Sequence, residues 1–427
     1  MIKKILKTSI NLGTSVTARY LYWVFSGNAV SIVLAFFTTI IIARYLTKEE
    51  FGLYLALFTF ANLGADLGEV GLGSTLASFL PGLVLEKKHT EIHGLLSTAF
   101  YIEFTLGIIM TIVLIVFSPV LAHFLFANTQ PLNITITALM MFALLLFNFA
   151  TFALSAFKKF KEVATISIFY SVIRLLLLFG VAFLSRLTLS KTLIIFMFTP
   201  LVGWWYSLFH LGFNEFIGKG SLERAKKLVK FSGFLSLQKI FVGISSRLDF
   251  LMLVPLAGSF EAGVYGAASR ISQIYPFTIS SFAQVLAPKF AEYKTGKSAT
   301  SFFKKTGLVT ILLLLSDLVF YIFAKPIILF LFGAKYIDAI PVFQGLLLAM
   351  IGFIAATPFV SLLIYTLKKP YITAISSLVQ LIFIFSSNLL FVPRFGRFGP
   401  VIGIGLGNAA IFLISAFSTW YYLKKET

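Results

Sequence analysis

The feature that most constrains this chain is the regular return of apolar blocks, each about 20 residues long and each followed by a short polar segment. A helix of that length crosses the hydrocarbon of a bilayer. Hydrophobic residues make up 59% of the sequence and charged residues only 12%, about half the share of a soluble domain. The pattern predicts an all-α, polytopic membrane protein with about twelve spans. These are expected near residues 20–43, 52–80, 94–118, 132–156, 163–185, 192–213, 231–255, 262–287, 307–325, 340–366, 371–392 and 399–423.

The formal net charge of +19 follows the expected membrane topology. Most Lys and Arg residues outside the spans fall in the N-terminal segment, the even-numbered loops and the C-terminus, so both termini are expected in the cytoplasm. This distribution explains the basic excess without a nucleic-acid partner. Residues 1–17 are basic and amphipathic and are expected to lie on the cytoplasmic surface of the membrane.

Two pairs of similar stretches indicate an internal duplication. "ARYLTKEEFGLYLA" (43–56) can be laid over "VPLAGSFEAGVYGA" (254–267). The lysine pair that begins at Lys158 can be laid over the pair that begins at Lys368, at nearly the same separation along the chain. Two matches at one separation favour a true repeat.

Because six spans return a chain to the same side of the membrane, the two halves are expected to be parallel repeats. The predicted lobes are residues 18–213 and 231–427, and a polar cytoplasmic linker, 214–230, joins them. Transporters built in this way place the substrate path between their halves. The duplication therefore favours a transporter.

Three longer stretches carry a resemblance to a known family: residues 40–73, "SSRLDFLMLVPLAGSFEAGVYGAASRISQIYPFTISSFAQVLAPKF" (245–290) and "VPRFGRFGPVIGIGLGNAAIF" (392–412). They resemble the Wzx-type oligosaccharide flippases of the multidrug/oligosaccharidyl-lipid/polysaccharide (MOP) exporter superfamily. The sequence departs from these relatives at Ser78, near which many of them carry a basic residue.

The resemblance implies two six-helix bundles of the MOP or MATE type around a central cavity. It also implies that the protein moves a polyprenyl-(pyro)phosphate-linked oligosaccharide from the cytoplasmic to the outer leaflet. The expected partners are this lipid-linked oligosaccharide, membrane lipids and other polysaccharide-assembly proteins.

Basic side chains within spans normally face a cavity or a partner, because the bilayer centre disfavours a free charge. Arg247 and Arg270 are the best candidates for binding phosphate, since a guanidinium offers two parallel donors to phosphate oxygens. Lys239 precedes Arg247 on the same expected helix and would extend that site. Arg174 is left open between a cavity, a buried ion pair and packing.

Acidic residues also fall within spans. Asp66 and Glu69 lie three positions apart in the glycine-rich stretch 60–73 and share a helix face. The favoured interpretation is that they cap or staple a broken helix, past the midplane towards the cytoplasm; the alternative is coupling to H⁺ or Na⁺. Asp249 can pair with a neighbouring helix, and Asp317 is expected to pair with a basic residue.

The sequence predicts a transporter rather than an enzyme. It has no phosphate-binding GK[ST] loop, and the His-x-x-x-His spacing of His89 and His93 lies in an expected loop without the glutamate pattern of a metal-dependent hydrolase. We expect no metal site and no cofactor apart from a coupling ion, in a monomeric multi-pass protein of the cytoplasmic membrane. The main alternative is a cation-coupled exporter of small organic molecules, and a non-transporting scaffold comes third.

Overall fold

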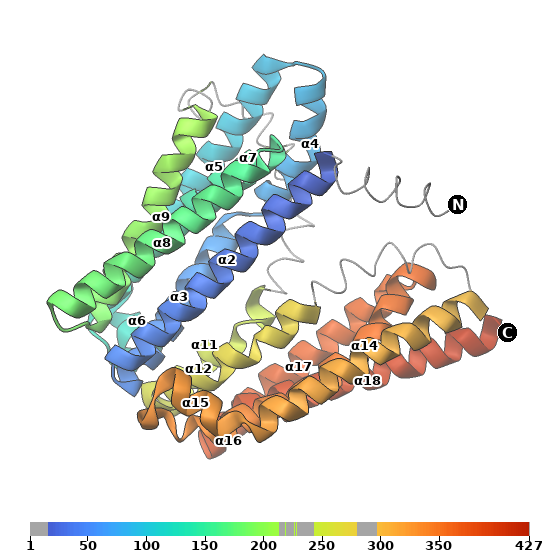
Figure 1. The fold of residues 1–427 in the computed structure, drawn as a ribbon. Helices are drawn as coiled ribbons and strands as arrows, with labels where there is room; N and C mark the ends of the chain where they lie inside the picture. The colour runs from blue at the N-terminus through green and yellow to red at the C-terminus, as the bar shows by residue number, and fades with distance from the viewer. Residues whose placement is uncertain are drawn as a thin grey trace. The chain divides into compact units, whose positions relative to one another are not determined.

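The computed structural model shows a protein whose regular elements are all helices in the part that it describes (Figure 1). Residues 1–15 of the predicted surface helix, most of the predicted linker and Lys239 lie outside that part. The described residues are 16–212, Gly218, Lys226, Leu228, 243–279 and 297–426.

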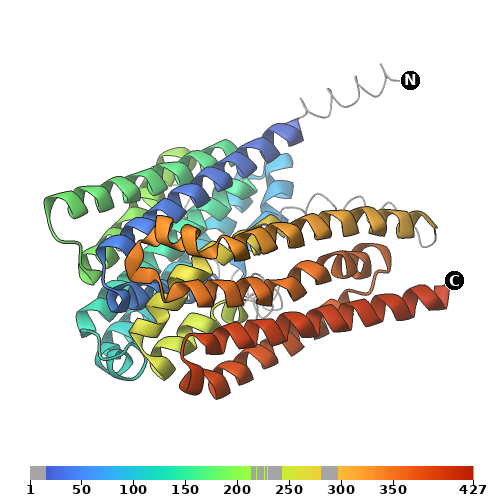
Figure 2. The same cartoon turned by 60° about the horizontal axis from the view of Figure 1, so that its bottom comes forward.

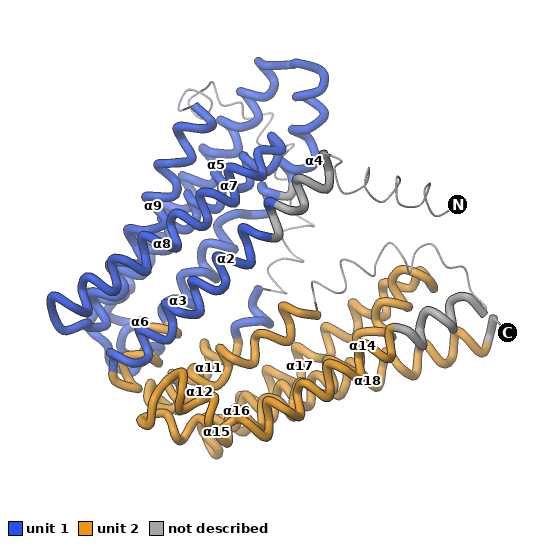
Figure 3. The backbone as a smooth tube through the Cα atoms, viewed as in Figure 1, with its two compact units in different colours: residues 1–46, 57–247 blue, residues 47–56, 248–427 orange. Residues whose placement is uncertain are grey.

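The chain divides into two compact units, coloured separately in Figure 3. Unit 1 contains residues 1–46 and 57–247, and unit 2 contains residues 47–56 and 248–427. The division cuts one helix between residues 56 and 57, near its middle, and leaves Arg247 as the last residue of unit 1.

Unit 1 is a helical bundle centred on α7, an almost wholly apolar helix with buried residues on every side. In Figures 1 and 2, α2 lies alongside α8, and α7 packs between α5 and α9. The helices with residues in this unit are α2 (Val16–Tyr45), α3 (Lys48–Gly68), α4 (Leu72–Leu85), α5 (His89–Val116), α6 (Ser118–Phe124), α7 (Pro131–Ala156), α8 (Phe160–Leu184) and α9 (Leu189–Leu211).

Unit 2 is built around α18, which packs against both α16 and α17 (Figure 2). The first turns of α3 also belong to this unit. Its other elements are α11 (Leu248–Ala257), α12 (Ser259–Ser272), α14 (Lys297–Ile322), α15 (Ala324–Phe332), η2 (Ala334–Tyr336), α16 (Ala339–Ser361), η3 (Leu362–Thr366), α17 (Pro370–Phe395) and α18 (Phe398–Glu426).

Nine helices of the described part are long and apolar enough to cross a membrane, and α14 with α15 makes a tenth if that pair, bent by 68°, counts as one span. The seventh and eighth expected spans lie partly outside the described residues. The multi-span, all-helical architecture is confirmed, whereas the count of twelve stays a prediction.

The predicted duplication is visible in the backbone. Lys158 has a φ of 59° and Lys368 a φ of 54°, which is the left-handed region that lysine seldom adopts. Each begins a lysine pair directly after a helix end, where a left-handed residue commonly stops a helix. The same unusual conformation at two matched positions supports the repeat.

A second matched pair lies at a helix crossing within unit 2. A Cβ atom at Gly52 of α3 would overlap the carbonyl oxygen of Ser259, and one at Gly263 of α12 would overlap the carbonyl oxygen of Lys48. The two contacts mirror each other, since each glycine faces the backbone four residues before the other. Glycine at both positions lets the two backbones approach this closely.

Candidate functional site

The glycine-rich stretch is where α3 ends and α4 begins. Val70 and Gly71 both have positive φ, 47° and 69°, and they break the helix. The backbone N–H of Gly73, in the first turn of α4, donates to Oε1 of Glu69 at 2.8 Å, and the Glu69 side chain is buried. A carboxylate in this position satisfies an N–H that has no partner within its own helix. Glu69 thus has the capping geometry that the structural interpretation requires.

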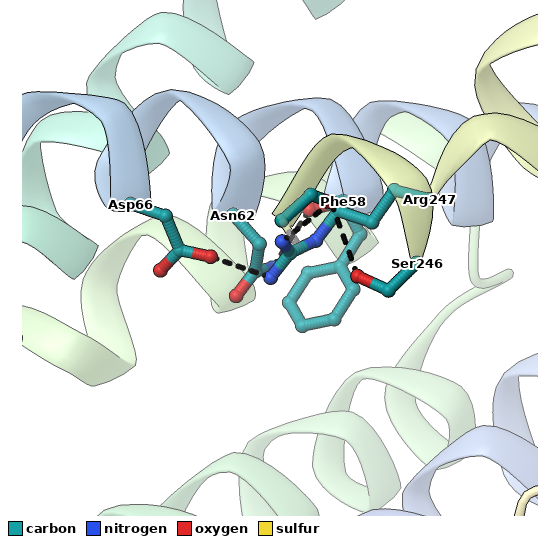
Figure 4. A network of polar contacts seen from close by, with 6 residues as sticks. Phe58, Asn62, Asp66, Ser246 and Arg247 are labelled. Carbon is teal, nitrogen blue, oxygen red and sulfur yellow. Dashed lines mark hydrogen bonds and ion pairs between the residues drawn. The ribbon is translucent and has the colours of Figure 1, made fainter. Parts of the chain in front are cut away.

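Asp66 makes a different contact (Figure 4). Its Oδ2 lies 2.7 Å from Nη2 of Arg247, and Nη1 of the same guanidinium donates to the carbonyl of Gly243 at 3.2 Å. Asn62, one turn earlier on α3, donates to the carbonyl of Phe58 at 2.7 Å. Asn62 and Asp66, four positions apart on α3, therefore present polar side chains on the same face of the helix (Figure 4). One candidate phosphate ligand and one candidate coupling residue are partners.

The depth of this pair can be read from the neighbouring helix. A Cβ at Gly64 would meet the side chain of Met141, and one at Gly68 would lie 3.2 Å from the side chain of Leu145. Both neighbours lie near the centre of α7, a span of 26 residues. Asp66 lies between the two glycines, so it is at mid-depth of the bundle. Relative to the membrane, the expected position of Asp66 past the midplane towards the cytoplasm stays a prediction.

The pair is only partly buried. The Asp66 side chain is 42% exposed and that of Arg247 is 23% exposed within the chain. A charge at this depth is costly without a partner, and each group offsets the other. Because a guanidinium can hold a planar anion through two donors, Arg247 is a cationic fork that a carboxylate now occupies.

Arg174 lies on α8 in unit 1 and is buried, 6% exposed. Its guanidinium lies over the rings of Tyr170 and Phe196, at 4.4 and 4.6 Å from their centroids. The ring of Phe196 in turn contacts that of Phe58 edge-on at 5.3 Å. Of the options left open for Arg174, these contacts favour packing, since aromatic faces stabilise a desolvated cation.

In unit 2, Asp249 and Arg270 interact electrostatically, and each has its own hydrogen-bond partners. The Tyr265 hydroxyl donates to Oδ2 of Asp249 at 2.8 Å, and the Phe250 N–H donates to Oδ1 at 2.9 Å. Arg270 donates from Nη1 to Gln273 at 3.5 Å, while its buried Nε has no hydrogen-bond partner among the described residues. Arg270 therefore keeps one donor for another acceptor.

Asp317 is buried in α14, 3% exposed. Its side chain interacts with the hydroxyl of Tyr275, which also lies 3.5 Å from the Ser316 hydroxyl. The expected basic partner is not among its contacts within the described ranges. A tyrosine hydroxyl takes that place, which a lone acid in an apolar sequence could not indicate.

The sequence analysis missed an ion pair at the start of α3. Nζ of Lys48 lies 2.6 Å from Oδ2 of Asp338, and the same ammonium lies over the ring of Phe260 at 4.9 Å. The hydrogen bond from Lys48 lowers the pKa of the Asp338 carboxyl. No sequence pattern links a residue at the start of α3 to one that precedes α16, so only the folded chain reveals the pair.

One apolar pocket of about 180 Å³ opens between α3, α5 and α7 in unit 1. Its α3 residues recur every three or four positions and face away from the Asp66 side of that helix. Such a lining suits hydrocarbon and offers nothing to a phosphate. The described residues include no cluster of His, Asp or Glu that could hold a metal ion. The pocket is lined by Phe60, Leu63, Gly64, Leu67, Met110, Val113, Leu114 and Met141.

Comparison with known proteins adds a family and a fold. Residues 41–341 match the model of a family described as polysaccharide biosynthesis protein. The chain is 22% identical over 413 residues to an uncharacterized membrane protein in the cps region of Klebsiella pneumoniae, covering 92% of this chain and 79% of that protein. It is 25% identical over 215 residues to the lipopolysaccharide biosynthesis protein WzxC of Escherichia coli K12, covering 48% and 41% of the two chains.

Solved structures confirm the fold class. An inward-facing multidrug resistance MATE transporter of the MOP superfamily superposes with a TM-score of 0.74 at 14% identity, over 92% of this chain and 96% of that one. The lipid II flippase MurJ, in an inward closed conformation, gives 0.71 at 15% identity, over 92% and 87%. At these identities the likeness establishes the fold of MOP transporters.

Proposed function

The chain belongs to the polysaccharide biosynthesis protein family, and from that membership we propose that it is a flippase for a lipid-linked oligosaccharide. It carries a polyprenyl-(pyro)phosphate-linked glycan from the cytoplasmic to the outer leaflet by alternating access, as a transporter and not as an enzyme. It acts as a monomer in the cytoplasmic membrane with both termini in the cytoplasm. The polysaccharide relatives and the lipid II flippase among its structural neighbours support this cargo class.

The observation that carries the proposal is the guanidinium of Arg247 at mid-depth of unit 1. A sugar-phosphate headgroup cannot cross hydrocarbon without compensation for its charge. Arg247 already holds a carboxylate, Asp66, through Nη2, and phosphate offers the same kind of acceptor oxygens. Arg270, with its unpaired Nε, is a second phosphate candidate within unit 2.

The alternative, a cation-coupled exporter of small organic molecules, is favoured by one observation. Asp317 is a buried carboxyl whose polar contact in the described part is the Tyr275 hydroxyl, and such a group suits binding of H⁺ or Na⁺. An exporter of this kind would leave the leaflet distribution of glycan lipid unchanged. The same group can also supply the ion coupling of a flippase, so it does not by itself decide the cargo.

The test is the leaflet distribution of lipid-linked glycan in cells depleted of the protein and then restored with variants. Depletion should accumulate glycan lipid that faces the cytoplasm, and the wild-type chain should clear it. Arg247→Lys keeps the charge that Asp66 needs but loses the fork, so it should clear the lipid at least tenfold more slowly at equal expression. Arg186→Ala, in the exposed turn before α9, is the matched control and should behave as wild type. Unchanged sidedness on depletion would redirect the search to small soluble cargo.

A further inference from the structure

Arg247 does not offer an empty site in this structure. Its Nη2 is taken by Oδ2 of Asp66 at 2.7 Å, and its Nη1 by the carbonyl of Gly243. A guanidinium has further N–H donors, but a headgroup phosphate that binds through Nη2 on this side of Arg247 competes with the Asp66 carboxylate. The backbone carbonyl is fixed by the chain, whereas the carboxylate is on a side chain that can rotate away.

We propose that Asp66 is an intramolecular competitor of the cargo phosphate, which holds the Arg247 fork closed between transport cycles and is displaced when the headgroup binds. This inference rests on the proposed flippase function and names the residue that sets the affinity of its phosphate site. It assigns Asp66 a role separate from that of Glu69, although the two lie three residues apart.

Exposure and partner number separate the two acids. Asp66 is 42% exposed, and Arg247 is its single ion-pair or hydrogen-bond partner among the described residues. Glu69 is 4% exposed and accepts from the backbone of α4. A capping carboxylate has no reason to leave, whereas a half-exposed carboxylate with one contact can give up that contact when another anion takes its place.

The exchange has a consequence for affinity. When the binding-competent form is only a fraction of the population, the apparent dissociation constant rises in inverse proportion to that fraction. If the closed pair outnumbers the open fork by about ten to one, the cargo binds about tenfold more weakly than to a free fork. Once displaced, Asp66 also places a negative charge beside the phosphate, which favours release. A flippase needs that release in every cycle.

Binding of farnesyl phosphate to the purified full-length chain tests the inference. Asp66→Asn removes the competing charge and should tighten binding about tenfold, while Asp66→Glu keeps the charge and should stay within about twofold of wild type. Arg247→Ala should weaken binding, and the Asp66→Asn/Arg247→Ala double variant should be as weak as Arg247→Ala alone. Asp338→Asn removes an acid from the other ion pair and should leave the affinity unchanged.

The outcomes separate this inference from the function on which it rests. Tighter binding by Asp66→Asn that disappears in the double variant supports the competitor. Binding by Asp66→Asn that is equal to or weaker than wild type, with Arg247→Ala also weakened, overturns the competitor and leaves the flippase proposal standing. Normal binding by Arg247→Ala overturns the competitor together with the assignment of the phosphate site. Asp66→Glu, which preserves the ion pair, shows whether any loss in Asp66→Asn reflects folding.

Discussion

An alanine at Gly263 should destabilise unit 2 more than its size suggests. Its methyl group would overlap the backbone carbonyl of Lys48, and a carbonyl within a helix cannot rotate out of the way. Overpacking of this kind costs about 1–3 kcal/mol, against a gain of about 0.5–1 kcal/mol for replacing a helical glycine by alanine. We expect a net loss of about 1–2 kcal/mol, measured as a lower melting temperature of the purified protein in detergent.

The mirrored contact supplies a second variant, and an open glycine supplies the control. Gly52→Ala should cost a similar amount, and the double variant should cost less than the sum, because one substitution already forces the two backbones apart. Gly180→Ala on α8 places its methyl group where no atom lies within 4 Å, so only the gain in helix propensity remains. A Gly263→Ala protein that melts at or above the wild-type temperature would refute the close crossing.

Three further predictions concern the helix ends. Glu69→Ala should cost about 0.5–2 kcal/mol by removing the cap of α4, whereas Glu69→Gln, which keeps an acceptor oxygen, should recover most of that loss; equal melting temperatures would argue against the cap. Lys368→Gly should raise the melting temperature, since glycine accepts a positive φ, while Lys369→Gly, at a negative φ, should not; the reverse order would contradict the assigned backbone. The pKa of the Asp338 carboxyl in its ion pair with Lys48 lies below the ordinary value for aspartate. The stabilisation from the pair is therefore present above about pH 4 and is lost as the pH falls through the lower folded pKa. The difference in melting temperature between Asp338→Asn and wild type is small for a pair so exposed, and it should vanish on the acid side but not on the alkaline side.

The fold could be predicted further from the sequence than the site could. Spans follow from hydropathy because lipid leaves the backbone few alternatives to a helix. The duplication was predicted from matched residues. Lys158 and Lys368 share a positive φ, so the matched positions also have the same backbone conformation. The break after Glu69 was signalled by the density of glycine around it. The sequence did not indicate the depth of this break within the bundle, because that depth depends on which helix packs beside α3.

The site shows where the prediction had to stop. The rule that an intramembrane charge faces a cavity or a partner was applied to Arg247, whereas Asp66 was expected to cap a broken helix or to couple an ion. It could not select the pair, because their contact depends on how two distant segments pack, and no local spacing records that packing. The same rule assigned Asp317 a cation, whereas the structure shows a tyrosine hydroxyl beside it. A neutral hydrogen-bond donor can also contact a buried carboxyl in lipid. The rule therefore predicts that such a carboxyl has a partner, but not whether that partner is charged.

One matched pair shows how a small sequence difference redirects an interaction between repeats. Glu50 accepts from the N–H of Thr47 while the Thr47 hydroxyl accepts from the N–H of Glu50, which is a complete capping box at the start of α3. Its counterpart Glu261 follows Gly258, which has no hydroxyl to complete such a box. Glu261 instead accepts from the N–H of Arg397 at 3.0 Å, at the start of α18. The duplication therefore places Glu50 and Glu261 at matching helix positions. The residue three positions earlier, Thr47 or Gly258, determines whether the carboxylate caps its own helix or accepts a hydrogen bond from the start of α18.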